Sequence, residues 1–244
     1  MPNGSREKIG FVFDLDGTLL DDVSLFMDLP YELSNIYDVE ITEEEIEALK
    51  DKLIDKMSEK GSKSLILKLI LDMAKEFGIP WYRRIGFLKK LHDIYKERVP
   101  NIELFPGTME VLKELKNKYN AELGIYTTSS VNEIYEKCQK FDGFLEIFDE
   151  DLIGRDSVTN LKPSPEGLNL LSEKWNIPTK RIIMVGDMEV DISAGKNAKS
   201  VTIGVLGGFS SMEHMQSYQP DFIFDNISGI IADIDQILNK LYKH

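Results

Sequence analysis

The sequence predicts an α/β protein: a doubly wound, mainly parallel sheet core with an inserted four-helix domain. Three observations predict this fold. The apolar run Phe11-Val12-Phe13 suits a strand that is buried on both faces. Residues 21–103 show apolar positions at helical spacing only, whereas strand-like and helix-like segments alternate from residue 106 onward. We therefore expect a core domain built from residues 1–20 and 104–244, and a helical cap domain formed by residues 21–103.

The inserted segment contains four predicted helices. The first covers residues 25–37, and the second begins at a capping box in which Glu45 follows Thr42 by three positions. The third follows a Lys-Gly-Ser-Lys loop at residues 60–63, and Pro80 starts the fourth. The residues expected on one apolar face of that fourth helix are Trp81, Ile85, Leu88, His92, Tyr95 and Val99. Four helices with short links can pack as a small bundle.

The rest of the chain predicts a Rossmann-like core. Strands are expected at residues 9–13, 122–126, 181–185, 200–205 and 222–224, and a weak strand is expected within residues 147–153. Helices are expected at residues 107–119, 131–141, 165–175, 190–198, 212–218 and 227–242. This alternation gives a mainly parallel sheet with helices on both faces. Because ligands bind beyond the carboxyl ends of the strands in such a sheet, the residues just after each strand are candidates for a site.

Polar residues follow three of the predicted strands at that end. They are Asp14 and Asp16, then the hydroxyl residues Thr127, Thr128, Ser129 and Ser130, then Asp187 and Asp191. Clustered carboxylates repel one another unless a proton or a cation relieves the charge, and an all-oxygen cluster suits a hard cation such as Mg²⁺. Lys162, stiffened by the following proline ahead of a predicted helix, could reach the same edge. This set fits phosphoryl transfer, in which positioning and charge neutralisation provide most of the catalysis.

Each of these features also has an ordinary structural interpretation. Asp-Gly pairs such as Asp16-Gly17 are common in turns. Asp187 and Asp191 could cap the following helix, because the positive end of the helix dipole favours carboxylates. Lys162 taken alone could be a solvated surface lysine. All four features nevertheless occur in order at predicted strand ends, and this joint occurrence favours the catalytic interpretation.

The same residues resemble the motifs of a known family. The stretch DLDGTL at residues 14–19 is similar to the first motif of the haloacid dehalogenase-like superfamily. The second, third and fourth motifs are matched in the family's order by Thr127, by Lys162, and by Gly186-Asp187 with Asp191. The helical insertion and the stretch LFPG at residues 104–107 resemble the branch of that superfamily with a helical cap, which contains phosphoglycolate phosphatases and β-phosphoglucomutases.

The resemblance implies a role for each motif residue. Asp14 would be the nucleophile that forms an aspartyl-phosphate. Asp16 would protonate the leaving oxygen as a general acid and then activate water as a general base. Thr127 and Lys162 would bind the phosphoryl oxygens, and Thr128 would add a substrate contact.

The resemblance also implies a metal and a substrate loop. Mg²⁺ would be held by Asp14, by the backbone carbonyl of Asp16, by Asp187, and by Asp191 acting either through water or as an orienting residue. In resembling enzymes, the loop at the place of residues 60–63 reads the substrate. Lys63 is therefore a candidate substrate-binding residue, although a solvated interhelical turn explains this loop equally well.

Together these roles describe a Mg²⁺-dependent phosphatase that acts on a small phosphomonoester, such as phosphoglycolate or a sugar phosphate. Two alternatives remain open. A phosphomutase of the β-phosphoglucomutase type would return the phosphoryl group to its product. A non-enzymatic signalling module that is phosphorylated on aspartate, like a two-component receiver domain, would use a similar set of residues. The long helical insertion argues against the receiver, because receivers are compact single domains.

Composition limits the partners. The chain has 42 acidic and 29 basic residues, a formal net charge of −13, which argues against general binding to nucleic acid or anionic membranes. The single cysteine, Cys138, excludes an internal disulfide. The first residues contain no secretory signal, and no stretch reaches the length of a membrane span. We expect a cytoplasmic protein, a monomer or homodimer, that acts on a small phosphorylated metabolite.

Overall fold

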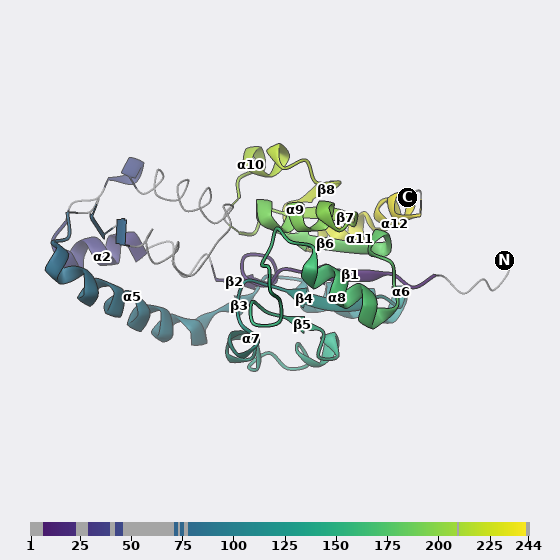
Figure 1. Ribbon diagram of the computed structural model, residues 1–244, viewed down its shortest axis with the longest axis horizontal. Coiled ribbons are helices and arrows are strands. Elements are labelled where there is room, and N and C mark those ends of the chain that lie inside the picture. The colour runs from purple at the N-terminus through teal and green to yellow at the C-terminus, as the bar shows by residue number, and fades with distance from the viewer. Residues whose placement is uncertain are drawn as a thin grey trace. The chain divides into compact units, whose positions relative to one another are not determined.

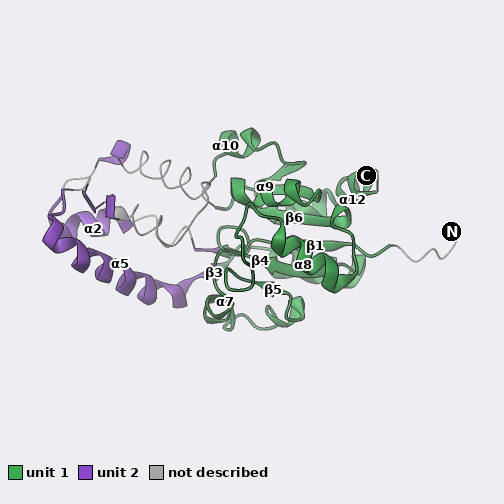
Figure 2. Ribbon diagram, in the orientation of Figure 1, with its two compact units in different colours: residues 1–20, 104–244 green, residues 21–103 purple. Residues whose placement is uncertain are grey.

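The protein divides into two compact units (Figure 2). The first contains residues 1–20 and 104–244, and the second contains residues 21–103. The computed structural model describes residues 7–22, 29–39, 42–45, 71–72, 74–75, 78–208 and 210–242. The chain passes between the units twice, and both crossings fall in a two-stranded sheet in which β2 (Leu20–Asp21) pairs with β3 (Glu103–Leu104).

The first unit contains a parallel sheet, six-stranded in its described residues, in the order β5-β4-β1-β6-β7-β8 (Figure 1). Its strands are β1 (Gly10–Phe13), β4 (Glu122–Tyr126), β5 (Leu152–Ile153), β6 (Ile182–Gly186), β7 (Val201–Val205) and β8 (Phe222–Phe224). The chain builds outward from β1 through β4 and β5, and then returns to the other side of β1 for the remaining strands. This reversal places a ligand-binding position at the carboxyl ends of β4, β1 and β6.

Helices cover both faces of the sheet. They are α6 (Thr108–Tyr119), α7 (Val131–Cys138), α8 (Glu166–Trp175), α9 (Glu189–Asn197), α10 (Met212–Ser217), α11 (Gly229–Ala232) and α12 (Ile234–Leu241). Val12 of β1 packs in one core cluster with residues of α8 and α9, including Leu168 and Ala194. Phe11 and Phe13 point to the opposite face, because side chains alternate along a strand, and they too are fully buried. The predicted doubly wound core is therefore confirmed.

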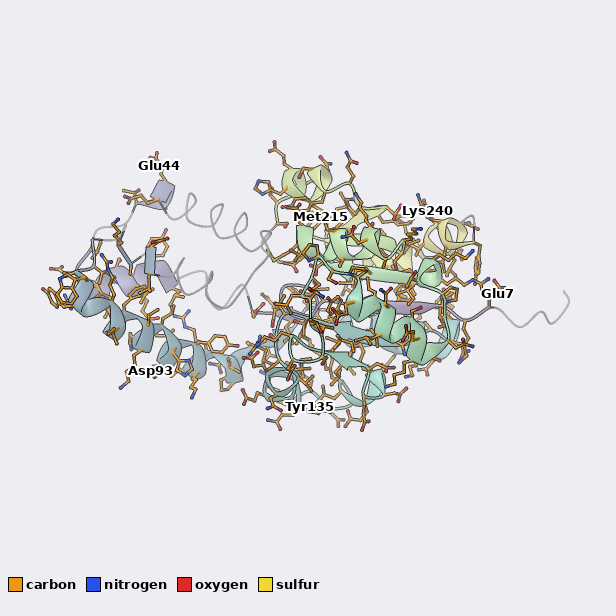
Figure 3. All side chains as sticks on the ribbon, in the orientation of Figure 1. Glu7, Glu44, Asp93, Tyr135, Met215 and Lys240 are labelled. Atoms are coloured by element: carbon orange, nitrogen blue, oxygen red, sulfur yellow. The ribbon has the colours of Figure 1, made fainter. Side chains whose placement is uncertain are left out.

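The weak strand expected within residues 147–153 is confirmed at Leu152 and Ile153. The final helix differs from the prediction, because it is interrupted at Asp233. On α7, Tyr135 points outward (Figure 3), whereas Ile134, Lys137 and Cys138 are buried. The buried residues of α7 are thus three and four positions apart, which is the spacing of one helix face, and one of them is a lysine.

The second unit is mainly helical in its described residues. It contains α2 (Leu29–Tyr37) and α5 (Arg84–Arg98), and residues 43–45, 71–72 and 74–75 are also helical. The predicted capping box is confirmed, because the Glu45 N–H donates to Thr42 Oγ1 at 3.2 Å and the Thr42 N–H donates to Glu45 Oε2 at 2.9 Å. The core of this unit is formed by Leu33, Ala74, Ile79, Phe87 and Ile94. Lys63 and the loop at residues 60–63 lie outside the described residues.

The predicted apolar face of the last inserted helix is wrong. Phe87 and Ile94 are buried, whereas Trp81 and Ile85 are 79% and 81% exposed and His92 is also exposed. Residues 81–83 form a 3₁₀ turn, and the α-helix begins only at Arg84. Ile85 and His92 belong to the same α-helix as Phe87 and Ile94, so the buried face of α5 lies about two residues along from the predicted one. In the part of the chain that the structure describes, no helix combines the length and apolar character needed to cross a membrane.

Candidate active site

Three central strands end at the same edge of the sheet, and each is followed by a motif residue. Asp14 follows β1, Thr127 follows β4 and Asp187 follows β6. All three are buried. The Asp14 N–H donates to the Val185 carbonyl at 2.8 Å, which extends the pairing of β1 with β6 up to the site. The sheet therefore brings together side chains that are far apart in the sequence.

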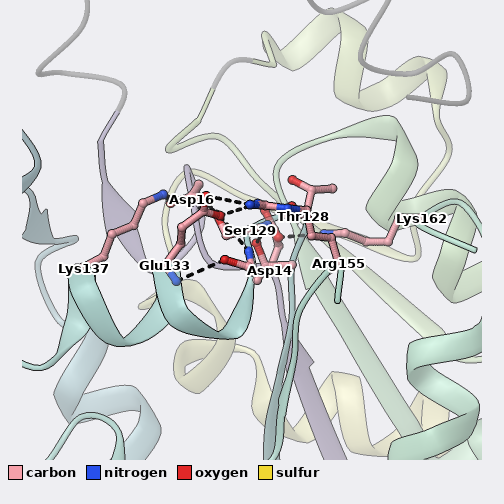
Figure 4. A network of polar contacts seen from close by, with 10 residues as sticks. Asp14, Asp16, Thr128, Ser129, Glu133, Lys137, Arg155 and Lys162 are labelled. Carbon is pink, nitrogen blue, oxygen red and sulfur yellow. Dashed lines mark hydrogen bonds and ion pairs between the residues drawn. The ribbon is translucent and has the colours of Figure 1, made fainter. Parts of the chain in front are cut away.

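Lys162 reaches this edge from the loop before α8. Its Nζ donates to Asp14 Oδ1 at 2.6 Å (Figure 4) and to Asp191 Oδ1 at 2.5 Å. The ammonium also lies 5.5 Å from the centre of the Tyr126 ring, within the range of a cation–π contact. Lys162 is only 5% exposed, so the interpretation as a solvated surface lysine is wrong.

Burial and charge oppose each other in this cluster. Burial raises the pKa of Asp14 to about 7; Lys162 opposes this, and Asp191 raises the pKa further. Burial by itself would lower the pKa of Lys162, but the charges of Asp14 and Asp191 outweigh burial and raise it. Lys162 therefore stays protonated. The cluster contains three buried carboxylates, those of Asp14, Asp187 and Asp191, so one ammonium does not offset all of the buried negative charge.

The remaining negative charge fits a divalent cation. Asp14, Asp187 and Asp191 are buried, and each can offer a carboxylate oxygen within 4.8 Å of the others. Buried oxygen ligands with excess negative charge are the ligand set of hard cations such as Mg²⁺. Asp191 uses both of its oxygens within the protein, because Oδ1 accepts from Lys162 and Oδ2 accepts from the Met188 N–H at 3.0 Å. This arrangement favours the orienting alternative for Asp191.

Close backbone approach holds the Asp187 carboxylate in place. Thr18 Oγ1 donates to Asp187 Oδ1 at 3.1 Å. A Cβ atom would lie 2.6 Å from Asp187 Oδ2 at Gly17 and 1.7 Å from it at Gly208, so a side chain at either position would displace the carboxylate. Gly17 and Thr18 stand in the predicted DLDGTL motif, whereas Gly208 was missed because no local pattern links the loop after β7 to the site.

The two threonines after β4 are placed differently. Thr127 is buried, and its Oγ1 accepts from the Ser129 N–H at 3.2 Å. Thr128 is exposed, and its carbonyl accepts from Arg155 Nη1 at 3.3 Å. Thr127 therefore lies with Asp14 at the edge of the sheet, while the side chain of Thr128 faces solvent.

Asp16 contacts Lys137, whereas Asp14 contacts Lys162. Its Oδ1 accepts from Lys137 Nζ at 2.5 Å, and its Oδ2 accepts from Ser129 Oγ at 2.8 Å (Figure 4). Sequence reasoning missed Lys137, because a lysine in the middle of a predicted amphipathic helix is ordinarily exposed.

A further network holds the start of α7. The Ser130 N–H donates to Glu133 Oε2 at 2.7 Å, and the Glu133 N–H donates to Ser130 Oγ at 3.3 Å, which forms a capping box. Arg155 pairs with both carboxylate oxygens of Glu133 (Figure 4). The hydrogen bond from Arg155 lowers the pKa of Glu133 from its usual 4.5 to about 2, although partial burial opposes this. The loop of residues 127–130 is thereby anchored at its helical end.

We expect the stabilising effect of Glu133 to depend on pH. Because its pKa is lowered in the folded state, the effect is fully present above pH 4.5 and is lost as the pH falls toward about 2. The free energy of unfolding of wild type should exceed that of Glu133→Gln at about pH 6, and the difference should shrink steadily toward about pH 3. Urea unfolding at a series of pH values measures this difference, with Glu136→Gln as the control on the same helix. A difference that is constant over that range would contradict the assignment.

A buried acidic cluster and a lysine lie at the edge where a doubly wound sheet binds its ligands, so the fold and site define an α/β protein of the Rossmann-like class with a candidate site for phosphoryl transfer. The family model for haloacid dehalogenase-like hydrolases matches residues 11–205. The chain therefore belongs to the haloacid dehalogenase-like hydrolase family, and the resemblance of its motifs to that family is confirmed.

Curated relatives agree with this assignment. The chain is 34% identical over 130 residues to a pyrophosphatase PpaX of Listeria monocytogenes, and this match covers 52% of this chain and 58% of that protein. It therefore spans little more than half of that relative's length. A phosphoglycolate phosphatase of Shigella boydii is 27% identical over 236 residues, which cover 91% of this chain and 90% of that protein.

Solved structures show the same fold. A predicted phosphoglycolate phosphatase from Haemophilus somnus superposes with a TM-score of 0.73 at 23% identity, over 96% of this chain and 100% of that one. A family hydrolase from Deinococcus radiodurans, with bound phosphate and sodium, superposes with a TM-score of 0.72 at 15% identity, over 93% of this chain and 95% of that one.

Proposed function

We propose that this protein is a Mg²⁺-dependent phosphatase that hydrolyses a small phosphomonoester through an aspartyl-phosphate. The observation that carries the proposal is the 2.6 Å contact between the buried Asp14 and Lys162, at the edge where Asp187 also lies. A carboxylate beside a fixed ammonium can approach a phosphorus atom whose negative charge that ammonium helps to neutralise.

The reaction divides between two aspartates. One carboxylate oxygen of Asp14 attacks phosphorus, and a new O–P bond forms as the bond to the leaving oxygen breaks. Asp16 gives its proton to the leaving oxygen. A water molecule then attacks the phosphorus of the aspartyl-phosphate, and Asp16 takes a proton from this water. As the new O–P bond forms, the bond between phosphorus and the Asp14 oxygen breaks, which releases inorganic phosphate and restores the Asp14 carboxylate. Lys162 and the Thr127 hydroxyl bind the phosphoryl oxygens during both steps.

The metal and the inserted unit complete the proposal. Asp14, Asp187 and the backbone carbonyl of Asp16 would hold Mg²⁺, which supplies charge neutralisation and orientation of the phosphoryl group. Asp191 holds Lys162 in place rather than acting on substrate. Residues 21–103 act as a cap that excludes water during the reaction, as inserted lids do in other enzymes.

The curated relatives support hydrolysis over transfer. Those reported above are a pyrophosphatase and a phosphoglycolate phosphatase, so the phosphomutase alternative is not favoured. The hydrolase family model likewise does not favour a non-enzymatic signalling module. Phosphoglycolate and sugar phosphates are the first candidates for the substrate. Inorganic pyrophosphate is a second candidate, because the 34% identical relative is named for that activity.

Phosphate release from a panel of substrates tests the proposal. The panel contains phosphoglycolate, hexose phosphates, inorganic pyrophosphate and p-nitrophenyl phosphate. We expect release from at least one of them in Mg²⁺, loss of that release after chelation with EDTA, and recovery when excess Mg²⁺ is restored. Release that survives chelation would contradict the metal requirement. No release from any substrate would contradict the phosphatase, and a rearranged hexose phosphate without free phosphate would favour the mutase.

A further inference from the structure

One lysine is buried on the inner side of α7. Lys137 is 4% exposed, although its neighbours Tyr135 and Glu136 are exposed. Burying an ammonium costs free energy unless its charge is paired and its hydrogens have acceptors. Since a well-packed apolar side chain often serves as well as a buried ion pair for stability, packing alone does not explain a lysine here.

The partner of this lysine is the proposed proton-transfer residue. Lys137 Nζ lies 2.5 Å from Asp16 Oδ1 and 3.4 Å from Ser129 Oγ, and Ser129 Oγ donates to Asp16 Oδ2 at 2.8 Å (Figure 4). Both carboxylate oxygens of Asp16 are therefore held by α7 and the loop before it. The side chain of Asp16 is nevertheless 24% exposed, against 5% for that of Lys137, so a reacting group can still reach the carboxylate.

The two aspartates of the first motif have separate supports. Lys162 contacts Asp14 and Asp191, whereas Lys137 contacts Asp16. The two lysines come from different elements, the loop before α8 and the inner face of α7. A change at Lys137 can therefore act on proton transfer without removing the cation beside the nucleophile.

We propose that Lys137 is a positioning residue which, together with Ser129, holds the Asp16 carboxylate in the orientation needed for proton transfer. This inference rests on the proposed function and extends it to a residue outside the four motifs. Lys137 acts through Asp16 and does not touch the reacting atoms. Without it, the carboxylate can rotate away from the leaving oxygen and from the attacking water.

The leaving group distinguishes this role from a general structural one. An alkoxide leaving group needs the proton that Asp16 gives, whereas p-nitrophenolate can leave without one. In Lys137→Met, we expect kcat/KM to fall about 100-fold for an alkyl phosphate and less than about 10-fold for p-nitrophenyl phosphate. Hydrolysis of the aspartyl-phosphate should also slow, because that step needs Asp16 as a base. A burst of p-nitrophenol close to one equivalent per enzyme should therefore precede slower turnover.

Matched variants show whether the effect depends on a positive charge at residue 137 itself. Lys137→Arg keeps the charge and hydrogen-bond donors and should recover part of the lost activity. Lys140→Met removes the same charge from an exposed residue of the next turn and should behave as wild type. Ser129→Ala removes only one donor to Asp16 and provides the same comparison if Lys137→Met does not fold. Equal falls in kcat/KM for both substrates, or no fall for either, would overturn the inference.

A structural readout does not depend on activity. In a crystal structure of Lys137→Met, the Asp16 carboxylate should leave the position in which it contacts Ser129. A carboxylate that keeps its wild-type orientation would overturn the inference even if no substrate had been found. Absence of turnover in the wild-type enzyme would instead contradict the proposed function, so the two failures remain distinct.

Discussion

Asp14→Asn is expected to abolish phosphate release while leaving the fold intact. The amide cannot form the aspartyl-phosphate, so turnover should fall by about 10⁴-fold or more, as it does when a catalytic nucleophile is removed. The fold should tolerate the change, because burial already raises the pKa of Asp14 to about 7 and a neutral side chain of the same shape relieves repulsion with Asp191. Phosphate release and urea unfolding measure the two outcomes.

Asp151→Asn is the matched control for this variant. Asp151 is also buried, accepts from Trp175 Nε1 at 2.6 Å and pairs with Lys174 at 2.5 Å. It precedes β5 and so lies at the amino end of the sheet, opposite the candidate site. It should keep wild-type rates. Near-normal turnover in Asp14→Asn would show that another group is the nucleophile.

Lys162→Met is expected to cause the largest loss of stability. Removing one partner of a buried ion pair costs about 3–5 kcal/mol, because the remaining charge is left buried without compensation. Here Asp14 and Asp191 would both lose their shared cation. Protons or a divalent cation can replace it in part, so stability should recover as the pH falls and when Mg²⁺ is added. Urea unfolding in EDTA and in Mg²⁺, at a series of pH values, measures these effects.

Lys174→Met provides the comparison for Lys162. The side chain of Lys174 is 56% exposed, so its ammonium stays largely hydrated, and the buried Asp151 with which it pairs also accepts from Trp175 Nε1 and keeps that donor when the lysine is removed. We expect a small change in the free energy of unfolding that does not respond to Mg²⁺. If Lys162→Met were as stable in EDTA as Lys174→Met, the ammonium of Lys162 would not be offsetting the charge of the acidic cluster.

The core elements could be predicted because the polarity pattern of each is local. Buried strands such as β6 read as apolar runs, and helices such as α8 show apolar residues at helical spacing. Prediction failed for the buried face of α5, where Ile85 is exposed and Phe87 and Ile94 are buried in the same helix. The weak strand within residues 147–153 was predicted without its ends, because the two residues of β5 form too short a pattern to define them.

Local pattern was sufficient for the order of strands and helices, for the motif residues and for their placement at strand ends. Tertiary packing alone decided which lysine supports which aspartate. Asp14 and Lys162 are 148 positions apart, and Asp16 and Lys137 are 121 positions apart. Likewise, only the seating of the loop after β7 brings Gly208 against Asp187. Such contacts depend on how helices and loops lie across the sheet, and the spacing of residues within a single element carries no information about that arrangement.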